Sequence, residues 1–167
     1  MVGLGEENWA QVRRDMLTEL KRNHDIYIKS YKVWATIEEL VAILDCWVSP
    51  ADRQYWMTLP YMGHIIAHAY NIVVQYFSKY QCLTFLPLSS DPVPVEMRQE
   101  HGLAFVNNNH FVHVVLKNNC PMPPIVDHWT RYHEPKAEGW KTSDTEDRIA
   151  TFRGLVSSKR STPLKIL

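Results

Sequence analysis

The pattern of apolar residues changes once along this chain, near Asn71. Upstream, apolar residues recur at helical spacing, most clearly in the segment 6–25, whose apolar positions include Trp9, Val12, Met16, Leu17 and Leu20. Downstream, β-branched and aromatic residues gather in short runs at 72–77 and 82–86, which is typical of strands. Because helices precede strands and do not alternate with them, the sequence predicts an α+β fold with N-terminal helices followed by a mostly antiparallel sheet.

Local signals predict where further helices of the first half begin. Thr36 and Glu39 form a capping-box pattern, in which each side chain accepts a bond from the other residue's N–H, and this helix is expected to run to about Cys46. Pro50 directly follows the N-cap candidate Ser49, and Pro60 lies two residues after the N-cap candidate Thr58; proline is favoured in the first helical turn. Two shorter helices are therefore expected after these prolines.

A β-hairpin is predicted around residues 102–116. The strand-like runs 102–106 and 110–116 flank Asn107-Asn108-Asn109, and asparagine tolerates the positive φ of a tight turn. This arrangement makes His110 the first residue of the second strand.

The C-terminal part is less regular in sequence. The stretch from Trp129 to Trp140 has no helical or strand period and is interpreted as irregular. The pattern of residues 143–146 predicts the start of a last helix that runs through Leu155, and the polar residues 157–162 are expected to form a frayed tail.

Composition narrows the classes of function. The 167 residues carry 18 basic and 18 acidic side chains, so the one-signed field that would predict a nucleic acid or membrane-surface partner is absent. Apolar runs are far shorter than the roughly 20 residues of a membrane span, and acids stand near the N-terminus where a signal peptide has bases. We therefore expect a single soluble protein of an intracellular compartment, the cytoplasm or nucleus.

The cysteines read as reduced thiols. Cys46, Cys82 and Cys120 are odd in number, widely spaced and without a C-x-x-C pair, so neither a disulfide framework nor a zinc knuckle is predicted. A catalytic thiol needs a helix N-terminus or a neighbouring cation to lower its pKa. None of the three is expected at a helix N-terminus or beside a cation. Cys46 ends a predicted helix, Cys82 begins a strand, and Cys120 precedes Pro121 in a loop.

His110 is the first candidate for chemistry. A tight turn holds a side chain rigidly and leaves it reachable from solvent, and histidine is the natural general base near neutral pH. The alternative is a histidine that is simply packed beside Phe111 or exposed on the surface. His113 lies three residues further along the same strand, so the two rings should face opposite sides of the sheet.

His64 and His68 are the second candidate. They stand four residues apart on a predicted helix, which is a spacing used for metal ligands. Ile65 stands where an H-E-x-x-H motif has glutamate, and no third ligand is apparent. We expect these two rings to pack against neighbouring elements without a metal.

Four segments together carry a family resemblance. The segments 5–20, 56–67, 83–88 and 105–112 resemble OTU (ovarian tumour)-like cysteine protease domains of plant, transposon-associated proteins, over about residues 3–135. The resemblance implies a papain-like α+β fold, cleavage of ubiquitin isopeptide bonds by a catalytic cysteine and histidine, and no cofactor. The residues that match the family's histidine and following aromatic are His110 and Phe111. It also implies an OTU-like domain at 1–135 and a C-terminal extension at 136–167, with a possible helix and a frayed tail.

The departures from the family are as informative as the match. In the family an Asp-Gly-Asn-Cys block, which opens the nucleophile helix, lies shortly upstream of the segment matched here by residues 5–9. The nucleophile and its oxyanion donor are therefore expected to be missing, which should leave an unfilled groove beside the sheet. Val112 stands where some members have a third catalytic side chain, and Asn108 of the turn is an alternative.

These observations lead to one expectation and two alternatives. We expect a truncated OTU-like deubiquitinase that is inactive, with His110 near the surface, on the side where residues 3–9 enter, and no cysteine sulfur within hydrogen-bond reach. One alternative is a non-catalytic module that binds ubiquitin, a ubiquitin-like protein or another protein. The other is a metal-dependent hydrolase built on His64 and His68.

Overall fold

The first predicted helix, residues 6–25, forms two α-helices in the structure. In the computed structural model, which describes residues 6–31 and 36–160 with side chains to 158, α1 (Trp9–Arg22) follows a short 3-10 turn (Glu6–Asn8), and α2 (His24–Tyr31) follows α1. The expected single helix to Asp25 divides at Asn23. The Asn23 N–H donates to Glu19 O, while its own carbonyl accepts from Ile26 and Tyr27 and so starts α2.

The capping box predicts its helix correctly. Helix α3 (Ile37–Leu44) begins after Thr36, whose hydroxyl accepts from the Glu39 N–H at 3.2 Å, and the Glu39 carboxylate accepts from the Thr36 N–H at 3.4 Å. The helix ends two residues short of Cys46.

Only one of the two proline-led helices forms as an α-helix. That helix is α4 (Gly63–Tyr70), whereas the segment after Pro50 contains only a 3-10 turn (Arg53–Tyr55). In this segment backbone carbonyls accept hydrogen bonds from side chains, since Trp56 Nε1 donates to Ala51 O and Arg13 donates to Tyr55 O. Those contacts replace the regular helical bonds.

The second half forms a four-stranded mixed sheet in the order β2-β1-β3-β4. Its strands are β1 (Val73–Ser78), β2 (Cys82–Phe85), β3 (Glu100–Val106) and β4 (His110–Val114). The β1–β2 and β3–β4 pairs are antiparallel, and the central β1–β3 pair is parallel. The α+β class is confirmed, and the parallel centre of the sheet is a feature that local patterns did not predict.

The two outer edges of the sheet differ. The β2 edge is bridged by the segment before α5 (Asp127–Tyr132), because the Thr84 N–H donates to Pro124 O at 2.8 Å and the Val126 N–H donates to Thr84 O at 3.1 Å. In the described part of the chain, β4 pairs only with β3, so its other edge is open.

The interpretation of residues 129–140 as irregular is wrong. Helix α5 (Asp127–Tyr132) and a 3-10 helix (Pro135–Trp140) fill this stretch. Each is fixed by a buried tryptophan, with Trp129 Nε1 donating to Pro87 O and Trp140 Nε1 donating to Ser90 O, both at 2.9 Å. Hydrogen bonds to carbonyls far away in the sequence fix this region, and a repeating local pattern of apolar residues does not.

The last helix is longer than predicted. Helix α6 (Ser143–Arg160) begins after Thr142, whose hydroxyl accepts from the Thr145 N–H, and it continues past Leu155. Residues 157–160 of the expected frayed tail are therefore helical, and residues 161–162 lie outside the described residues.

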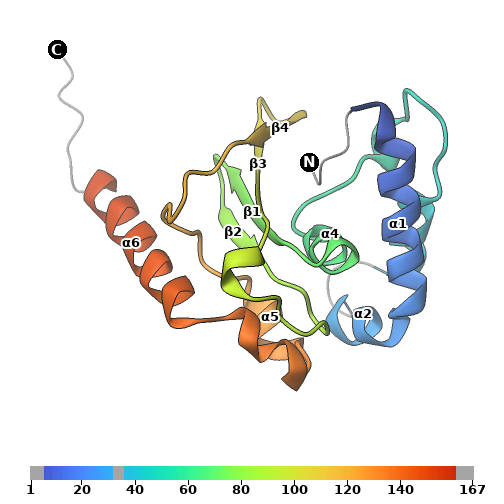
Figure 1. Ribbon diagram of the computed structural model, residues 1–167. Coiled ribbons are helices and arrows are strands. Elements are labelled where there is room, and N and C mark those ends of the chain that lie inside the picture. Colours follow the sequence, from blue (N-terminus) through green and yellow to red (C-terminus); the bar gives the residue numbers. More distant parts are fainter. Residues whose placement is uncertain (1–5, 32–35, 161–167) are drawn as a thin grey trace, which may run out of the picture.

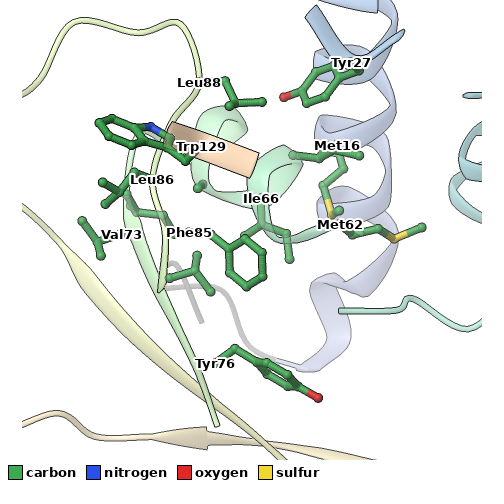
Figure 2. Close-up of a cluster of buried hydrophobic side chains, with 14 of the residues drawn as sticks. Met16, Tyr27, Met62, Ile66, Val73, Tyr76, Phe85, Leu86, Leu88 and Trp129 are labelled. Carbon is green, nitrogen blue, oxygen red and sulfur yellow. The ribbon is translucent and has the colours of Figure 1, made fainter. Parts of the chain in front are cut away.

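One core joins all parts of the described chain. Figure 1 shows α4 and α1 on one side of the sheet and α6 on the other. Side chains from α1 (Met16), α4 (Ile66), β2 (Phe85) and α5 (Trp129) meet in a buried cluster (Figure 2). Residues beyond position 135 also belong to this cluster, namely Ala137, Trp140 and Ile149.

Two carboxylate contacts with little exposure tie the layers together. The Glu19 carboxylate of α1 lies 3.0 Å from Nδ1 of His68 in α4 and also accepts from the Tyr27 hydroxyl at 3.0 Å. On the other face of the sheet, Arg148 of α6 donates two bonds of 2.7 Å to the carboxylate of Glu100 in β3. These contacts hold α1 to α4 and α6 to the sheet.

Candidate functional site

His110 is the first residue of β4, as predicted, and follows a tight turn. Asn107 and Asn108 adopt φ values of 53° and 56°, and His110 pairs with Val106 across the hairpin. Its side chain is exposed, and no hydrogen bond or ion pair reaches its ring from the described residues. The turn thus presents a histidine that is fixed in its backbone and free at its imidazole.

An apolar groove lies beside this hairpin. It has a volume of about 490 Å³ and is walled by residues of α1, of the 48–62 segment, of α4 and of the hairpin, including Trp9, Trp56, Met62, Leu103 and Phe111. The side chains of Trp9, Trp56 and Phe111 remain 37%, 39% and 37% exposed, so the groove presents aromatic surface to solvent.

The side of the sheet to which His110 points corrects one expectation. Side chains alternate along a strand, so His110 faces the opposite side of the sheet from Phe111. Phe111 lines the groove together with Trp9, and His110 does not. The expectation that the His110 ring lies on the Trp9 side is therefore wrong, and residues 3–5 lie outside the described residues. His113 shares the Phe111 face, with its ring 6.1 Å from that of His101, which confirms that His110 and His113 point to opposite sides.

The alternative role of Asn108 is not favoured by its contacts. Its side-chain amide donates to the Tyr80 hydroxyl at 3.4 Å and is not bonded to His110. No described side chain therefore orients the His110 imidazole.

None of the cysteines is bonded to His110. Cys82 Sγ contacts Ser78 O at 3.8 Å, and Cys120 Sγ lies 3.8 Å from a guanidinium nitrogen of Arg148. The expectation that no cysteine has a neighbouring cation is thus wrong for Cys120. Sequence could not indicate this pair, because the two residues are 28 positions apart and meet only when α6 packs on the sheet.

His64 and His68 are held by separate contacts. His64 Nδ1 lies 3.0 Å from Leu86 O, whereas His68 contacts Glu19 through Nδ1 and Ser89 Oγ, at 3.2 Å, through Nε2. The prediction that both rings pack against neighbouring elements is confirmed. Over residues 6–31 and 36–160, no three histidine, cysteine or acidic side chains are grouped closely enough to hold a metal ion.

Comparisons with known proteins do not extend this description. No protein-family model, no curated protein and no solved structure matches the chain. Within the described residues, no helix has the length and apolar character needed to cross a membrane.

Proposed function

We propose that this chain is an OTU-like, cysteine-type deubiquitinase domain in which His110 has the role of general base. The observation that supports it best is a histidine with a free ring, fixed by two left-handed asparagines at the first position of a strand and followed by Phe111. An imidazole presented in this way can accept a proton from a thiol that approaches it near neutral pH. Ubiquitin or a ubiquitin-like protein is the proposed substrate.

The 167-residue polypeptide by itself is proposed to be inactive. A cysteine is nucleophilic as a thiolate, and a histidine across the site is what stabilises that thiolate. The sulfurs of Cys82 and Cys120 contact Ser78 and Arg148, and neither these nor Cys46 is bonded to His110. Loss of the nucleophile lowers the turnover of a protease by about 10⁶, so the activity of this polypeptide should be close to background.

A second candidate is a module that binds ubiquitin without cleaving it. The groove favours it, because Trp9, Trp56 and Phe111 all line it and each exposes aromatic surface to solvent. Aromatic side chains of this kind are enriched at the centres of protein interfaces.

Ubiquitin with a thiol-reactive group at its C-terminus tests the enzymatic proposal. The 167-residue polypeptide should not label. A version extended upstream by a helix that carries an Asp-Gly-Asn-Cys block should label, and should lose labelling with His110→Ala. His113→Ala is the matched control, because this exposed histidine of the same strand faces the other side of the sheet. Equal labelling with and without His110 would refute its role.

Titration of the isotope-labelled polypeptide with unmodified ubiquitin tests the module. Saturable chemical-shift changes that centre on Phe111 and Trp9, and that weaken with Phe111→Ala, are expected if the groove binds ubiquitin. An absence of shifts up to millimolar ubiquitin would contradict the module and would leave the labelling experiment to decide the enzymatic proposal.

A further inference from the structure

A second groove lies on the side of the sheet that carries α6, between the β1–β2 turn and the C-terminal half of α6. It has a volume of about 500 Å³ and shares no lining residue with the groove beside β4. Lys79 and Tyr80 of the turn line one wall, and Phe152, Arg153 and Val156 of α6 line the other. Its size falls within the range of binding sites, about 300–1,000 Å³. We call it the Lys79–Arg153 groove.

Both walls of this groove expose apolar surface to solvent. Tyr80 in the turn is 72% exposed, and Val156 and the neighbouring Leu155 in α6 are 38% and 51% exposed. The last turns of α6 stand apart from the other labelled helices (Figure 1). Apolar side chains that gather at one place on a surface and are bordered by charged groups mark interaction sites. The groove therefore has the character of a docking surface for another molecule.

Each wall also carries one exposed cation without an acidic partner. Lys79 stands on the turn and Arg153 on α6, and neither forms an ion pair with an acid of the described residues. The segments that build the two walls, 73–85 and 148–160, contain no aspartate or glutamate. Asp127, at the start of α5, lines a different cavity and not this groove. The groove thus presents two positive charges beside its apolar surface and no negative charge among its lining residues.

We propose that the Lys79–Arg153 groove binds an acidic segment of a partner protein, in which an apolar side chain lies between carboxylates. The apolar side chain would pack between Tyr80 on one wall and Phe152 and Val156 on the other. The carboxylates would meet Lys79 and Arg153. The Lys79 ammonium lies over the Tyr80 ring, 6.0 Å from its centroid, so positive charge and aromatic surface are adjacent on that wall. Complementary charge of this kind speeds association and selects the partner.

Other occupants fit the charges of the groove less well. A nucleic-acid backbone is held by several lysine and arginine contacts, about 6–10 in strongly salt-dependent complexes. This groove has two cations, and the whole chain has equal numbers of acidic and basic side chains. The chain's own segment 161–167 contains Lys165 and no acidic side chain, so the two cations repel it. An acidic segment with an apolar side chain matches both the charge and the apolar surface.

Selection from a display library of random peptides, with the full chain as the bait, tests the chemistry of the partner. The recovered sequences should combine an aliphatic or aromatic residue with acids on both sides of it. One recovered peptide is then made in blocked form with two analogues, one with every acid changed to its amide and one with the apolar residue changed to serine. By fluorescence anisotropy both analogues should bind more weakly, and added salt should weaken the original because exposed charges are screened. Failure to recover any sequence, or recovery of sequences without acids, would overturn the proposal.

Two double variants with the same change in net charge test the place of binding. Lys79→Glu with Arg153→Glu reverses both cations of the groove, and Lys21→Glu with Lys29→Glu, on α1 and α2, is the control. All four side chains are exposed, so both variants should fold, which circular dichroism checks. An exposed ion pair corresponds to up to about 5-fold in affinity, and reversal adds repulsion, so the first variant should bind the selected peptide about 10-fold or more weakly.

The control variant should bind the selected peptide as the original chain does. Equal weakening in both variants, or none in the first, would overturn the proposal. Tighter binding of an oligouridylate than of the peptide would assign the groove to nucleic acid and overturn it. Self-association of the full chain that the Lys79→Glu, Arg153→Glu variant abolishes would assign the groove to a second copy, with the same consequence.

Discussion

Gly63→Ala should destabilise the protein, although alanine is a better helix former than glycine. Gly63 is the first residue of α4, and a Cβ built on it would lie 2.5 Å from Cγ and Cδ1 of Phe85 and 2.6 Å from Cδ2. Carbon atoms in contact are separated by about 3.5–4.0 Å, so the methyl group would overlap the ring by about 1 Å. Phe85 is 0% exposed and its ring packs edge-on against His64 at 5.2 Å, so it has no free space to move into.

The magnitude follows from two opposing contributions. Overpacking a buried site costs about 1–3 kcal/mol, while replacing glycine by alanine inside a helix gains at most about 1 kcal/mol. Gly154→Ala in α6 is the matched control, since nothing lies within 4 Å of its added Cβ. It should gain up to about 1 kcal/mol. Because the gain in helix propensity is common to both variants, the two should differ by the overpacking cost, about 1–3 kcal/mol in the free energy of unfolding.

Urea unfolding followed by circular dichroism measures this difference. For a chain of this length, each kcal/mol also shifts the melting temperature by about 2–4 °C. A double variant with Phe85→Ala should abolish the penalty of Gly63→Ala, because the ring that the methyl group meets is gone. If Gly63→Ala stabilises as Gly154→Ala does, the close packing of α4 on β2 is not as described.

Three further predictions concern Glu19, Glu100 and the hairpin turn. Burial raises the pKa of Glu19, but its contacts with His68 and two neutral donors outweigh this and hold that pKa below its ordinary value. The Glu19 carboxylate therefore stabilises the fold above about pH 4.3, and this stabilisation is lost as pH falls through the folded pKa. In urea titrations, the loss of unfolding free energy caused by Glu19→Gln should be smaller at pH 3 than at pH 7. Equal losses at the two pH values would contradict this. Glu100→Gln removes the charge that accepts two 2.7 Å bonds from Arg148, so it should lower the free energy of unfolding by about 2 kcal/mol. No measurable loss would show that the pair is not formed in solution. Asn108 has φ 56°, in the left-handed region that a β-branched residue resists and glycine adopts freely. Asn108→Val should therefore cost about 1–2 kcal/mol and lower the melting temperature, while Asn108→Gly should leave the melting temperature unchanged or higher. A lower melting temperature with glycine would argue against the left-handed turn.

Features with local causes could be predicted from the sequence. The capping box needs only Thr36 and Glu39, three positions apart, and the hairpin needs only asparagines between two apolar runs. The position of His110 at the start of a strand follows from the same local turn. The direction of its ring does not, because it depends on which face of the sheet each helix covers.

Features that join distant segments could not be predicted. Trp129 and Trp140 order their region through carbonyls 42 and 50 positions earlier, so no local period marks it. The parallel pairing of β1 with β3 depends on the long connection between them. A cavity between α2, α4, β2 and α5 is lined by residues from four segments, and the His128 contact to Ser30 spans 98 positions, a pairing that no sequence motif indicates.

The unequal edges of the sheet limit how copies of this chain could join through their strands. The segment 110–116 has no Asp, Glu, Lys or Arg, and Val115, the residue after β4, is 84% exposed, so the outer side of β4 lacks the charges that commonly discourage strand addition. The β2 side is already bridged through Thr84 and Ile125. With one open edge per described chain, two molecules that pair β4 against β4 leave neither with a free strand, so growth through the sheet stops at a symmetric pair and does not continue into a fibre.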